Sequence, residues 1–468
     1  MKFLPSLKPN PLAASFNNTF FILLWSVWFL GGCAQETAPT FASDIAPIIH
    51  QNCVTCHRPQ GGGPFSLISY NDVAKRSKMV AHVTQIRYMP PWPADPNYSA
   101  FLNQKMLSNE QIYLIQKWHK AGAPLGDTTV YQKQLSLLTQ HQEKRSPDWV
   151  VELQPIQIRG NHLDRFYVSK NPIELPNDTF VKMIEFIPGL PGTVHHVNGH
   201  VLNYPDSYPI DLFQGRTLVD VESNKFDKEF MEMNLDTEGE TPPKRIHSAV
   251  NYLPGVRGVF YPKGIGGFKL NKRAIFVFKD LHYGPSDTDA IDHSQLHIYF
   301  TKKPPKRPVH ETMLGTNGIS PIDPPLIIPP DSIKTFYTRA FIGEQDISLL
   351  TINPHMHLLG KSFKAYATKP NGDTIPLIHI PKWDFRWQYY YTFPTMIKIP
   401  RGSYIVVEAT YDNTSNNPNN PNKPPIRVSE RLTLGGASMR TTDEMLQFII
   451  SYLPYQEGDE HISLEPDA

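Results

Sequence analysis

The stretch "AIFVFKDLHYG" at positions 274–284 decides the fold class, because a short run of β-branched and aromatic residues is typical of a strand. Runs of the same kind recur as "FVKMIEFIP" (180–188), "QLHIYF" (295–300) and "SYIVVEATYD" (403–412). Pro, Gly and Asn separate them, and the chain holds 45 prolines among its 468 residues. That punctuation favours strands and turns over long helices. Beyond about residue 128 the sequence therefore predicts antiparallel β-sandwiches.

The β-rich part divides at a proline-rich segment. Residues 302–331 contain many prolines and show weak periodicity, so we expect them to connect two sandwich domains. The predicted boundaries are 150–305 for the first sandwich, 306–331 for the connection and 332–468 for the second sandwich. The chain length suits about three domains of ordinary size.

Residues 1–33 have the pattern of an export signal. Lys2 and Lys8 lie in a region without acidic residues, and the apolar run at 20–30 is short for a membrane span. The run ends in "LGGC", which resembles a bacterial lipobox and makes Cys33 the predicted lipidation site. The alternatives are an ordinary signal peptide, in which Cys33 is not lipidated, and a short membrane anchor. We expect an exported lipoprotein, anchored at a membrane surface in the periplasm or cell envelope.

The remaining two cysteines form "CVTCH" at 53–57, which is the attachment pattern of c-type haem. In that pattern Cys53 and Cys56 form thioethers to the haem, and His57 supplies the proximal iron ligand. A thioredoxin-like redox pair would need a βαβ context, and zinc would need two more ligands at short spacing. The sequence therefore predicts one covalent haem c.

Helical patterns surround this motif. "SDIAPIIHQ" (43–51) places isoleucines on one helical face, and "SNEQIYLIQKWHKAGAP" (108–124) opens with a capping box from Ser108 to Gln111. We therefore expect a small all-α cytochrome c domain at 41–128, followed by a linker at 129–149. The predicted fold class is multidomain: this all-α domain precedes two all-β, jelly-roll-like antiparallel sandwiches.

The second haem ligand is expected to be a methionine, since methionine sulfur commonly completes such iron sites. Met89 lies in "IRYMPPWPADP" (86–96), where two prolines stiffen the loop. Met79 falls inside a predicted helix at 70–87 and is expected in the core, while Met106 is the weaker alternative. We predict His57 and Met89 as the axial ligands.

Four further segments carry residues that bind metals well. "GTVHHVNGH" (192–200) holds an adjacent histidine pair, and "KDLHYG" (279–284) holds one histidine. "NPHMHLLG" (353–360) holds two histidines on either side of Met356, and "TTDEMLQF" (441–448) holds a methionine. Three imidazoles suffice for copper or zinc, whereas two imidazoles with a soft thioether favour copper, especially Cu(I). Met356 is expected to point away from its neighbours and pack in the core.

These segments, in this order, resemble the copper type II, ascorbate-dependent monooxygenases of the peptidylglycine α-hydroxylating and dopamine β-monooxygenase type. The resemblance covers roughly residues 150–455, and the N-terminal module resembles cytochrome c domains fused to such enzymes in bacteria. In that family both copper domains are β-sandwiches. The implied ligands are His195, His196 and His282 for one copper ion, and His355, His357 and Met445 for a second, catalytic copper ion.

Several positions depart from the family pattern. Asn353 stands where peptide-binding members have a carboxylate-binding arginine, Asp280 where the family has Gln, and Ile449 where it has Tyr. Adjacent residues on a regular strand point to opposite faces. His195 and His196 can therefore bind one metal ion only where the backbone is irregular. His196 with His200 is the rival choice.

The resemblance implies an oxidoreductase that uses O₂ to hydroxylate a C–H bond of a small-molecule or peptide substrate. The haem would pass on electrons from an external donor. The alternatives are a non-enzymatic haem and copper electron-transfer or copper-binding lipoprotein, and a carbohydrate- or peptide-binding sandwich with incidental histidines. With 45 basic and 44 acidic residues, the chain lacks the basic excess of nucleic-acid-binding proteins, so we expect no such partner.

Overall fold

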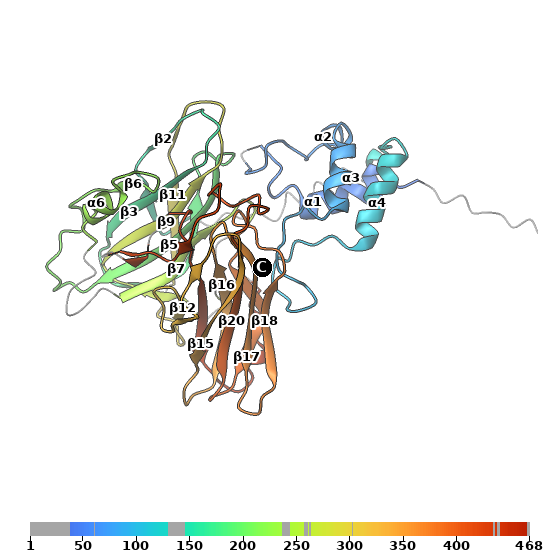
Figure 1. Ribbon diagram of the computed structural model, residues 1–468. Helices are drawn as coiled ribbons and strands as arrows, with labels where there is room; N and C mark the ends of the chain where they lie inside the picture. The colour runs from blue at the N-terminus through green and yellow to red at the C-terminus, as the bar shows by residue number, and fades with distance from the viewer. Residues whose placement is uncertain are drawn as a thin grey trace, which may run out of the picture. The chain divides into compact units, whose positions relative to one another are not determined.

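Strands dominate this chain. In the computed structural model, strands account for 38% of the residues and helices for 13%. Figure 1 shows strands as the main elements of the chain. The structure describes residues 38–59, 61–129, 146–235, 244–256, 261, 264–301, 303–433, 436–437 and 440–465. Residues 39–468 form one compact unit. Within the described ranges, no helix combines the length and the apolar character needed to cross a membrane.

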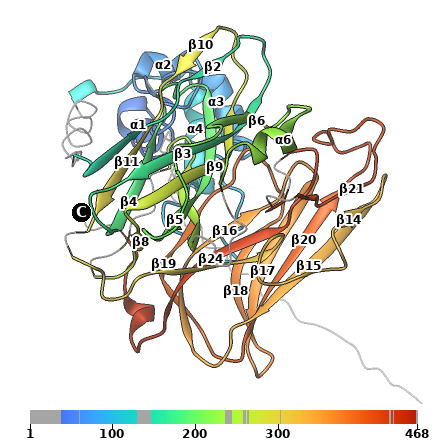
Figure 2. The same ribbon diagram turned by 90° about the vertical axis from the view of Figure 1, so that its left-hand side faces the viewer.

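Two large sheets share a first hydrophobic core. The four-stranded sheet has the order β1 (Trp149–Glu152), β11 (Gln295–Phe300), β4 (Thr179–Ile187), β8 (Phe268–Leu270). The five-stranded sheet has the order β6 (Leu218–Asp220), β3 (Arg165–Glu174), β9 (Arg273–Tyr283), β5 (Val194–Tyr204), β7 (Lys244–Tyr252). Neighbouring strands are antiparallel, and side chains such as Val197, Phe276 and Ile298 fill the core. The other face of the five-stranded sheet packs near α6 (Phe226–Met231), which lies beside β6 (Figure 2).

Two more large sheets share a second core. The four-stranded sheet has the order β12 (His310–Gly315), β24 (Gln447–Pro454), β16 (Ile347–His355), β19 (Tyr391–Ile399). The five-stranded sheet has the order β13 (Ile322–Asp323), β15 (Ile333–Phe341), β20 (Tyr404–Asp412), β17 (Gly360–Thr368), β18 (Thr374–Ile380). Three short pairs complete the described strands: β2 (Ile156–Ile158) with β10 (Ala290–Asp292), β14 (Ile327–Ile328) with β21 (Val428–Ser429), and β22 (Leu432–Thr433) with β23 (Gly436–Ala437).

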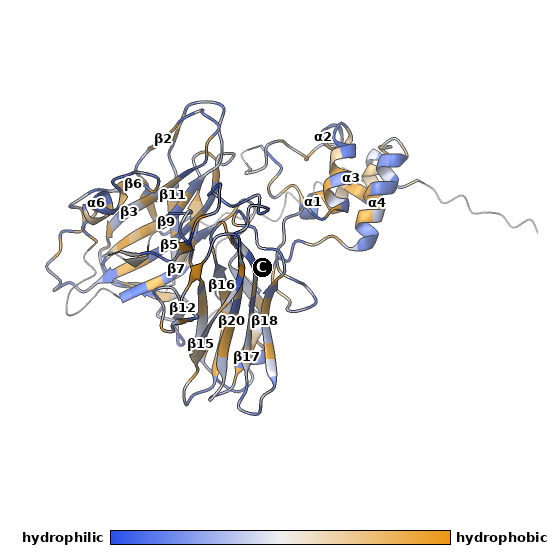
Figure 3. Ribbon diagram, in the orientation of Figure 1, coloured by the Kyte–Doolittle hydropathy of each residue, from blue (hydrophilic) through white to orange (hydrophobic). Residues whose placement is uncertain are grey.

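Alternation of side chains explains why these segments form strands. In β20, Ile405, Val407, Ala409 and Tyr411 are buried, and the residues between them are less covered. Burial of one such apolar side chain contributes about 1.5–3 kcal/mol. Figure 3 shows the same contrast across the molecule, with apolar colour along strands and hydrophilic colour along many connecting loops.

Helices are few and short in the described part of the chain. A π-helical turn η1 (Phe41–Ile45) leads into α1 (Ala46–Asn52), which ends at the CVTCH motif. The others in this region are α2 (Tyr70–Ala74), α3 (Ser77–Gln85) and α4 (Asn109–Lys120). The predicted capping box forms at α4, where Ser108 and Gln111 each accept an N–H of the other's backbone. Phe41, Ile115 and Trp118 belong to the small core between these helices.

The predicted fold class is wrong. The described residues form no small all-α cytochrome c domain, because the chain between α3 and α4 leaves the helices and joins the β-structure. Ala94 and Phe101 belong to the core of the second pair of sheets. The Leu102 N–H donates to the Thr392 carbonyl at 2.8 Å, and the Asp95 N–H donates to the His379 carbonyl at 2.7 Å. One mainly β unit thus replaces the predicted series of one all-α domain and two jelly-roll-like sandwiches.

Parts of the predicted organisation lie elsewhere. The signal peptide at 1–33 with Cys33, and residues 130–145 of the linker, fall outside the described residues. The proline-rich segment at 306–331 contributes the short strands β12, β13 and β14. The other predicted boundaries stay predictions.

Candidate metal centre

Two neighbouring strands bring three histidines together. His195 and His196 lie at the start of β5, and His282 lies near the end of the adjacent strand β9. His196 pairs directly with His282 across the sheet. The register shifts between Val194 and His196, so His195 sits at an irregularity of the strand. This irregularity allows the side chains of His195 and His196 to face the same point. Binding of one metal ion by both histidines requires that arrangement.

The geometry of the three imidazoles suits one metal ion. The Nδ1 atom of His196 lies 3.4 Å from Nδ1 of His195 and 3.3 Å from Nδ1 of His282. Ligand atoms of all three histidines lie within 4.8 Å of one another. Two nitrogens bound tetrahedrally to one ion at about 2.0–2.1 Å are separated by about 3.3 Å. The two distances from His196 therefore match those of a tetrahedral ligand set.

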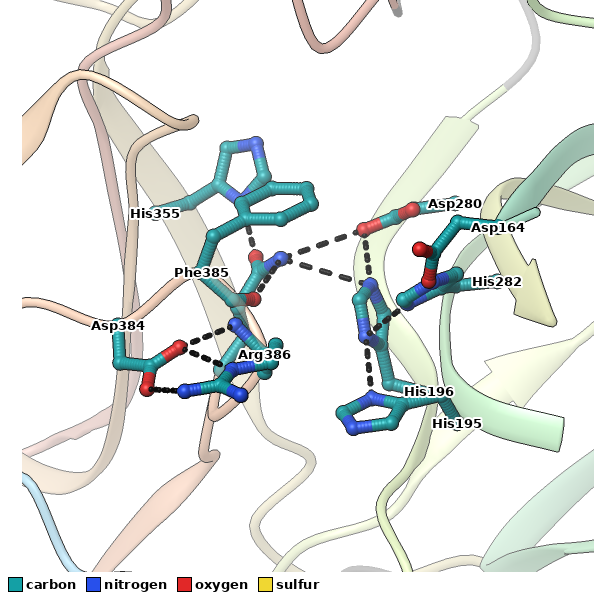
Figure 4. A network of polar contacts seen from close by, with 10 residues as sticks. Asp164, His195, His196, Asp280, His282, His355, Asp384, Phe385 and Arg386 are labelled. Atoms are coloured by element: carbon teal, nitrogen blue, oxygen red, sulfur yellow. Dashed lines mark hydrogen bonds and ion pairs between the residues drawn. The ribbon is translucent and has the colours of Figure 1, made fainter. Parts of the chain in front are cut away.

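Two carboxylates hold the other side of these rings. The Nε2–H of His196 donates to Asp280 at 2.7 Å, and the Nε2–H of His282 donates to Asp164 at 2.6 Å (Figure 4). Because these bonds place the proton on Nε2, the Nδ1 atoms carry free lone pairs that face each other. Uncompensated lone pairs at 3.3 Å repel, whereas a cation between them stabilises the arrangement. In metal sites of proteins, the ring N–H of a ligating histidine commonly donates to a carboxylate in this way.

The protonation states also favour a cation. Burial, with the nearby His196 and His282, lowers the pKa of His195 to about 3. Burial also lowers the pKa of His282, although its hydrogen bond to Asp164 opposes that effect. Burial opposes ionisation of Asp280, yet attraction by His196 and the hydrogen bond from it hold the pKa of this carboxyl well below its usual range. Neutral imidazoles backed by ionised carboxylates are the state that binds a metal.

Asp280→Asn is expected to weaken metal binding at this cluster about 10–100-fold, because the amide cannot fix the tautomer of His196 as a carboxylate does. The measurement is a competition titration of the purified protein with a chromophoric copper chelator. Asp178→Asn is the matched control, since Asp178 pairs with Lys269 on the surface of the same region. Equal affinities of the Asp280 and Asp178 variants would contradict the role given to Asp280.

The second predicted ligand set lies where β16 ends. His355 is the last residue of β16, and His357 lies beyond the end of the strand. The alternation of side chains along a strand therefore does not explain why the two histidines lie close together. Their ring centroids are 5.0 Å apart. The Nδ1–H of His355 donates to Gln388 at 2.5 Å, and the Nδ1–H of His357 donates to the Asp443 carbonyl at 3.0 Å. The Nε2 atom of His355 therefore remains available as a ligand.

Met445 lies close to the end of β16. His355 pairs with Gln447 at the start of β24, and the backbone N–H groups of His357 and Met445 both donate to the Glu444 carboxylate. Met445 and His357 are buried, and burial lowers the pKa of His355 to about 4. Met356 is fully buried in the core, which confirms its predicted position.

A buried carboxylate fixes the backbone of this ligand loop. Glu444 accepts hydrogen bonds from the backbone N–H groups of His357 at 2.9 Å and Leu359 at 2.6 Å. The N–H of Met445 donates to the same carboxylate at 3.3 Å. Burial raises the pKa of Glu444 to about 8, while these three donors favour the ionised form. Glu444 thus holds the segments of His357 and Met445 together.

Gln388 connects the two histidine clusters. Its amide oxygen accepts from His355, and its amide nitrogen donates to Asp280 at 3.4 Å, the same carboxylate that accepts from His196. Figure 4 shows this chain of contacts between the clusters. The Phe385 ring lies 5.7 Å from both His196 and His357, measured between ring centroids. The clusters are therefore neighbours joined by a polar bridge and an apolar ring.

The CVTCH motif also has a local geometry that suits its predicted use. Cys53 and Cys56 are free thiols, and burial, together with Cys56, raises the pKa of Cys53 to about 12. The Nδ1–H of His57 donates to the Phe65 carbonyl at 3.1 Å, which leaves Nε2 as the free ligand atom. A Cβ added at Gly63 would lie 2.7 Å from Nδ1 of His57, so this glycine lets the backbone approach the ring closely.

The methionines around the motif have different environments. Met89 is partly buried in the irregular loop after α3. The Met106 sulfur accepts a hydrogen bond from Gln104 at 3.7 Å. Met79 is 50% exposed, so its predicted core position is wrong. Its position in α3 follows the sequence pattern, but its side chain lies on the outer face.

Sequence reasoning missed most residues that support the ligands. Asp164, Gln388 and Glu444 had no pattern that marks them, whereas Asp280 precedes His282 by two residues and so shares its face of β9. His200, the rival partner of His196, lies outside the three-histidine cluster. Comparison with protein-family models found no match for this chain, and comparison with the curated proteins found no relative.

Proposed function

We propose that this protein is an exported, haem- and copper-containing oxidoreductase that uses O₂ to hydroxylate a C–H bond of its substrate. The observation that carries the proposal is the position of the His196 Nδ1 atom at 3.3–3.4 Å from the Nδ1 atoms of both His195 and His282. Carboxylates accept the Nε2–H of His196 and of His282. His355 and His357 lie next to this cluster, and the buried Met445 shares with His357 the Glu444 carboxylate as acceptor of its backbone N–H. Copper is the metal that both donor sets accept.

The chain's own residues would hold two different copper ions. His195, His196 and His282 offer nitrogen alone, while Met445 adds a soft sulfur to His355 and His357 and so favours Cu(I). Bound copper would supply O₂ activation and storage of the two electrons that hydroxylation consumes, one oxygen atom entering the substrate and the other leaving as water. Gln388 orients His355, Glu444 fixes the loop of His357, and Phe385 excludes water between the clusters.

Electrons would enter the protein through a haem bound beside the N-terminal helices. Cys53 and Cys56 would bind haem covalently, with His57 on one side of the iron and Met89 proposed for the other. An external one-electron reductant of the ascorbate class would deliver the electrons, as the family resemblance implies. This proposal rests on the motif and its local contacts and requires no separate cytochrome domain.

A peptide with a free C-terminal carboxylate is an unsuitable substrate. Asn353 occupies the position of the carboxylate-binding arginine, and its buried amide donates to the Tyr389 carbonyl at 3.1 Å. A neutral amide that is already engaged cannot make the bidentate, charged contact of a guanidinium. We therefore propose a substrate without a required carboxylate.

Met445→Ala is expected to weaken Cu(I) binding at one site and leave the other filled, starting from about two copper ions per chain. The measurement is metal content by mass spectrometry after dialysis, followed by Cu(I) competition with a chelator. Met313→Ala, a buried methionine of β12, is the matched control for loss of a core side chain.

Three outcomes separate the possible functions. A wild-type protein that binds zinc selectively, or no metal besides haem iron, overturns the proposal. Copper and haem without O₂-dependent product leave only electron transfer or copper binding. Equal Cu(I) affinities of the two methionine variants remove Met445 from the site.

A further inference from the structure

The aromatic segment "KWDFRWQYYYTF" at 382–393 has a structure of its own. Its period-2 aromatic residues predict one buried face of a strand, but β19 begins only at Tyr391. Before that point the backbone is irregular, and Trp387 and Tyr389 project from it into the space between the second core and the first histidine cluster. Trp387 and Tyr389 nevertheless lie side by side, as their spacing of two residues predicts.

The rings of this segment form a continuous series that ends at a proposed copper ligand. The Trp387 ring lies 5.4 Å from the His195 ring, and 6.5 Å from the nearly parallel ring of Tyr389, measured between centroids. The Tyr389 ring lies 5.2 Å from the Trp92 ring. Rings at 4.5–7 Å between centroids are in direct contact. Trp92, Tyr389, Trp387 and His195 therefore touch in sequence.

The other end of the series lies in the loop of Met89, the proposed second haem ligand. Tyr389 donates its hydroxyl hydrogen to the Pro91 carbonyl at 2.7 Å, in the loop that carries Met89. Trp92 follows Pro91 directly in the same loop. The CVTCH motif itself contacts the loop after β7, where Cys56 donates to the Pro254 carbonyl at 3.1 Å.

The rings of the series are shielded from water. Tyr389 is buried, and Trp92 and Trp387 are partly buried against the same core, so water is largely kept away from the rings. The indole N–H of Trp92 is buried and has no hydrogen-bond partner in the described structure. The row of rings joins the loop of Met89, a proposed haem ligand, to His195, a proposed copper ligand.

We propose that Trp92, Tyr389 and Trp387 form an electron path from the haem-binding segment to the histidine cluster of His195. The proposal rests on the proposed function and adds the route that electrons take inside the protein. One electron leaves ferrous haem, which becomes ferric, and one cupric ion becomes cuprous. A reductant of the ascorbate class restores the haem, and no proton or bond is transferred along the rings.

The test measures intramolecular electron transfer without substrate or turnover. Full-length protein with haem and Cu(II) bound is mixed anaerobically with a photosensitiser that reduces the haem by one electron in a flash. The decay of the ferrous haem absorption band and the loss of the Cu(II) electron paramagnetic resonance signal report the transfer. Trp387→Leu and Trp92→Leu are each expected to slow the decay of ferrous haem and the loss of the Cu(II) signal by roughly an order of magnitude or more. Trp387→Phe, which keeps a ring, is expected to retain most of the rate.

Two controls protect the interpretation. Trp149→Leu makes the same change in β1, outside the series, and is expected to leave the rate unchanged. Trp92 does not contact a proposed copper ligand among the described ring pairs, so its replacement should slow transfer without altering the Cu(II) spectrum. Unchanged rates in both leucine variants, with haem and copper present, would overturn the path alone. A wild-type protein without copper or haem would overturn the proposed function and the path together.

Discussion

His282→Ala is expected to remove one of the two proposed copper ions from the purified protein and leave the other bound. His282 supplies one of three Nδ1 atoms, and its ring is held between the stacked Phe166 ring at 4.2 Å and the Asp164 carboxylate. Two remaining imidazoles cannot complete a closed ligand set. The copper content measured after dialysis should therefore fall by about half.

The control for this loss must separate metal binding from folding. His282 is 3% exposed, so alanine also leaves a cavity in the sheet. His282→Gln fills most of that volume with a neutral amide and should lose the same copper ion, with a smaller change in melting temperature. His297→Ala, whose ring contacts Gln295 in β11, should keep both ions. Full copper content in a folded His282→Gln variant would remove this histidine from the site.

The first histidine cluster could be predicted only in part from the sequence. The adjacent pair in "GTVHHVNGH" indicated a metal site provided that the backbone was irregular, and the structure has a register shift at that point. Pairing of His196 with His282 depends on the register between strands 86 residues apart, which no local pattern determines. Asp164 lies still farther away and reaches the cluster from the start of β3.

The second cluster shows where strand periodicity fails. Alternation predicted a strand that presents His355 and His357 on one face, but β16 ends at His355. The position of His357 depends instead on Glu444, a residue 87 positions later that holds the loop through backbone N–H groups. Such tertiary hydrogen bonds override a two-residue repeat, because each buried donor must find an acceptor.

The error in fold class has the same origin. Local signals predicted α4 well, since the capping box at Ser108 forms as expected. Whether helices close into a domain depends on where the intervening chain packs. Phe101 packs on Tyr391 and Phe393 of β19 at 4.8 and 5.2 Å between ring centroids. The apolar residues of that loop therefore stabilise the β core, and helical periodicity contains no information about such a contact.

The other large effect is expected at the N-terminal motif: Cys53→Ala combined with Cys56→Ala should remove all covalently bound haem. A thioether needs a free thiol at each position, and both cysteines are unpaired in the described structure. Neither substitution removes a buried charge, and Cys56 gives up its hydrogen bonds with the Pro254 carbonyl and the Thr55 hydroxyl. The measurement is peroxidase staining of haem on a denaturing gel, since only covalent haem survives denaturation, together with haem absorbance of the native protein.

Cys33→Ala is the matched control, because it removes the third cysteine of the chain and lies outside CVTCH. This variant should keep its haem stain and move from the membrane fraction to the soluble exported fraction. Each single variant of the motif should keep a weaker stain through its remaining thioether. A stain that persists in the double variant, or a wild-type protein with no stain after expression in a host that matures c-type haem, would exclude thioether attachment at this motif. Because copper binding at His195, His196 and His282 needs no haem, the double variant should retain its copper, which separates the two cofactor proposals from each other.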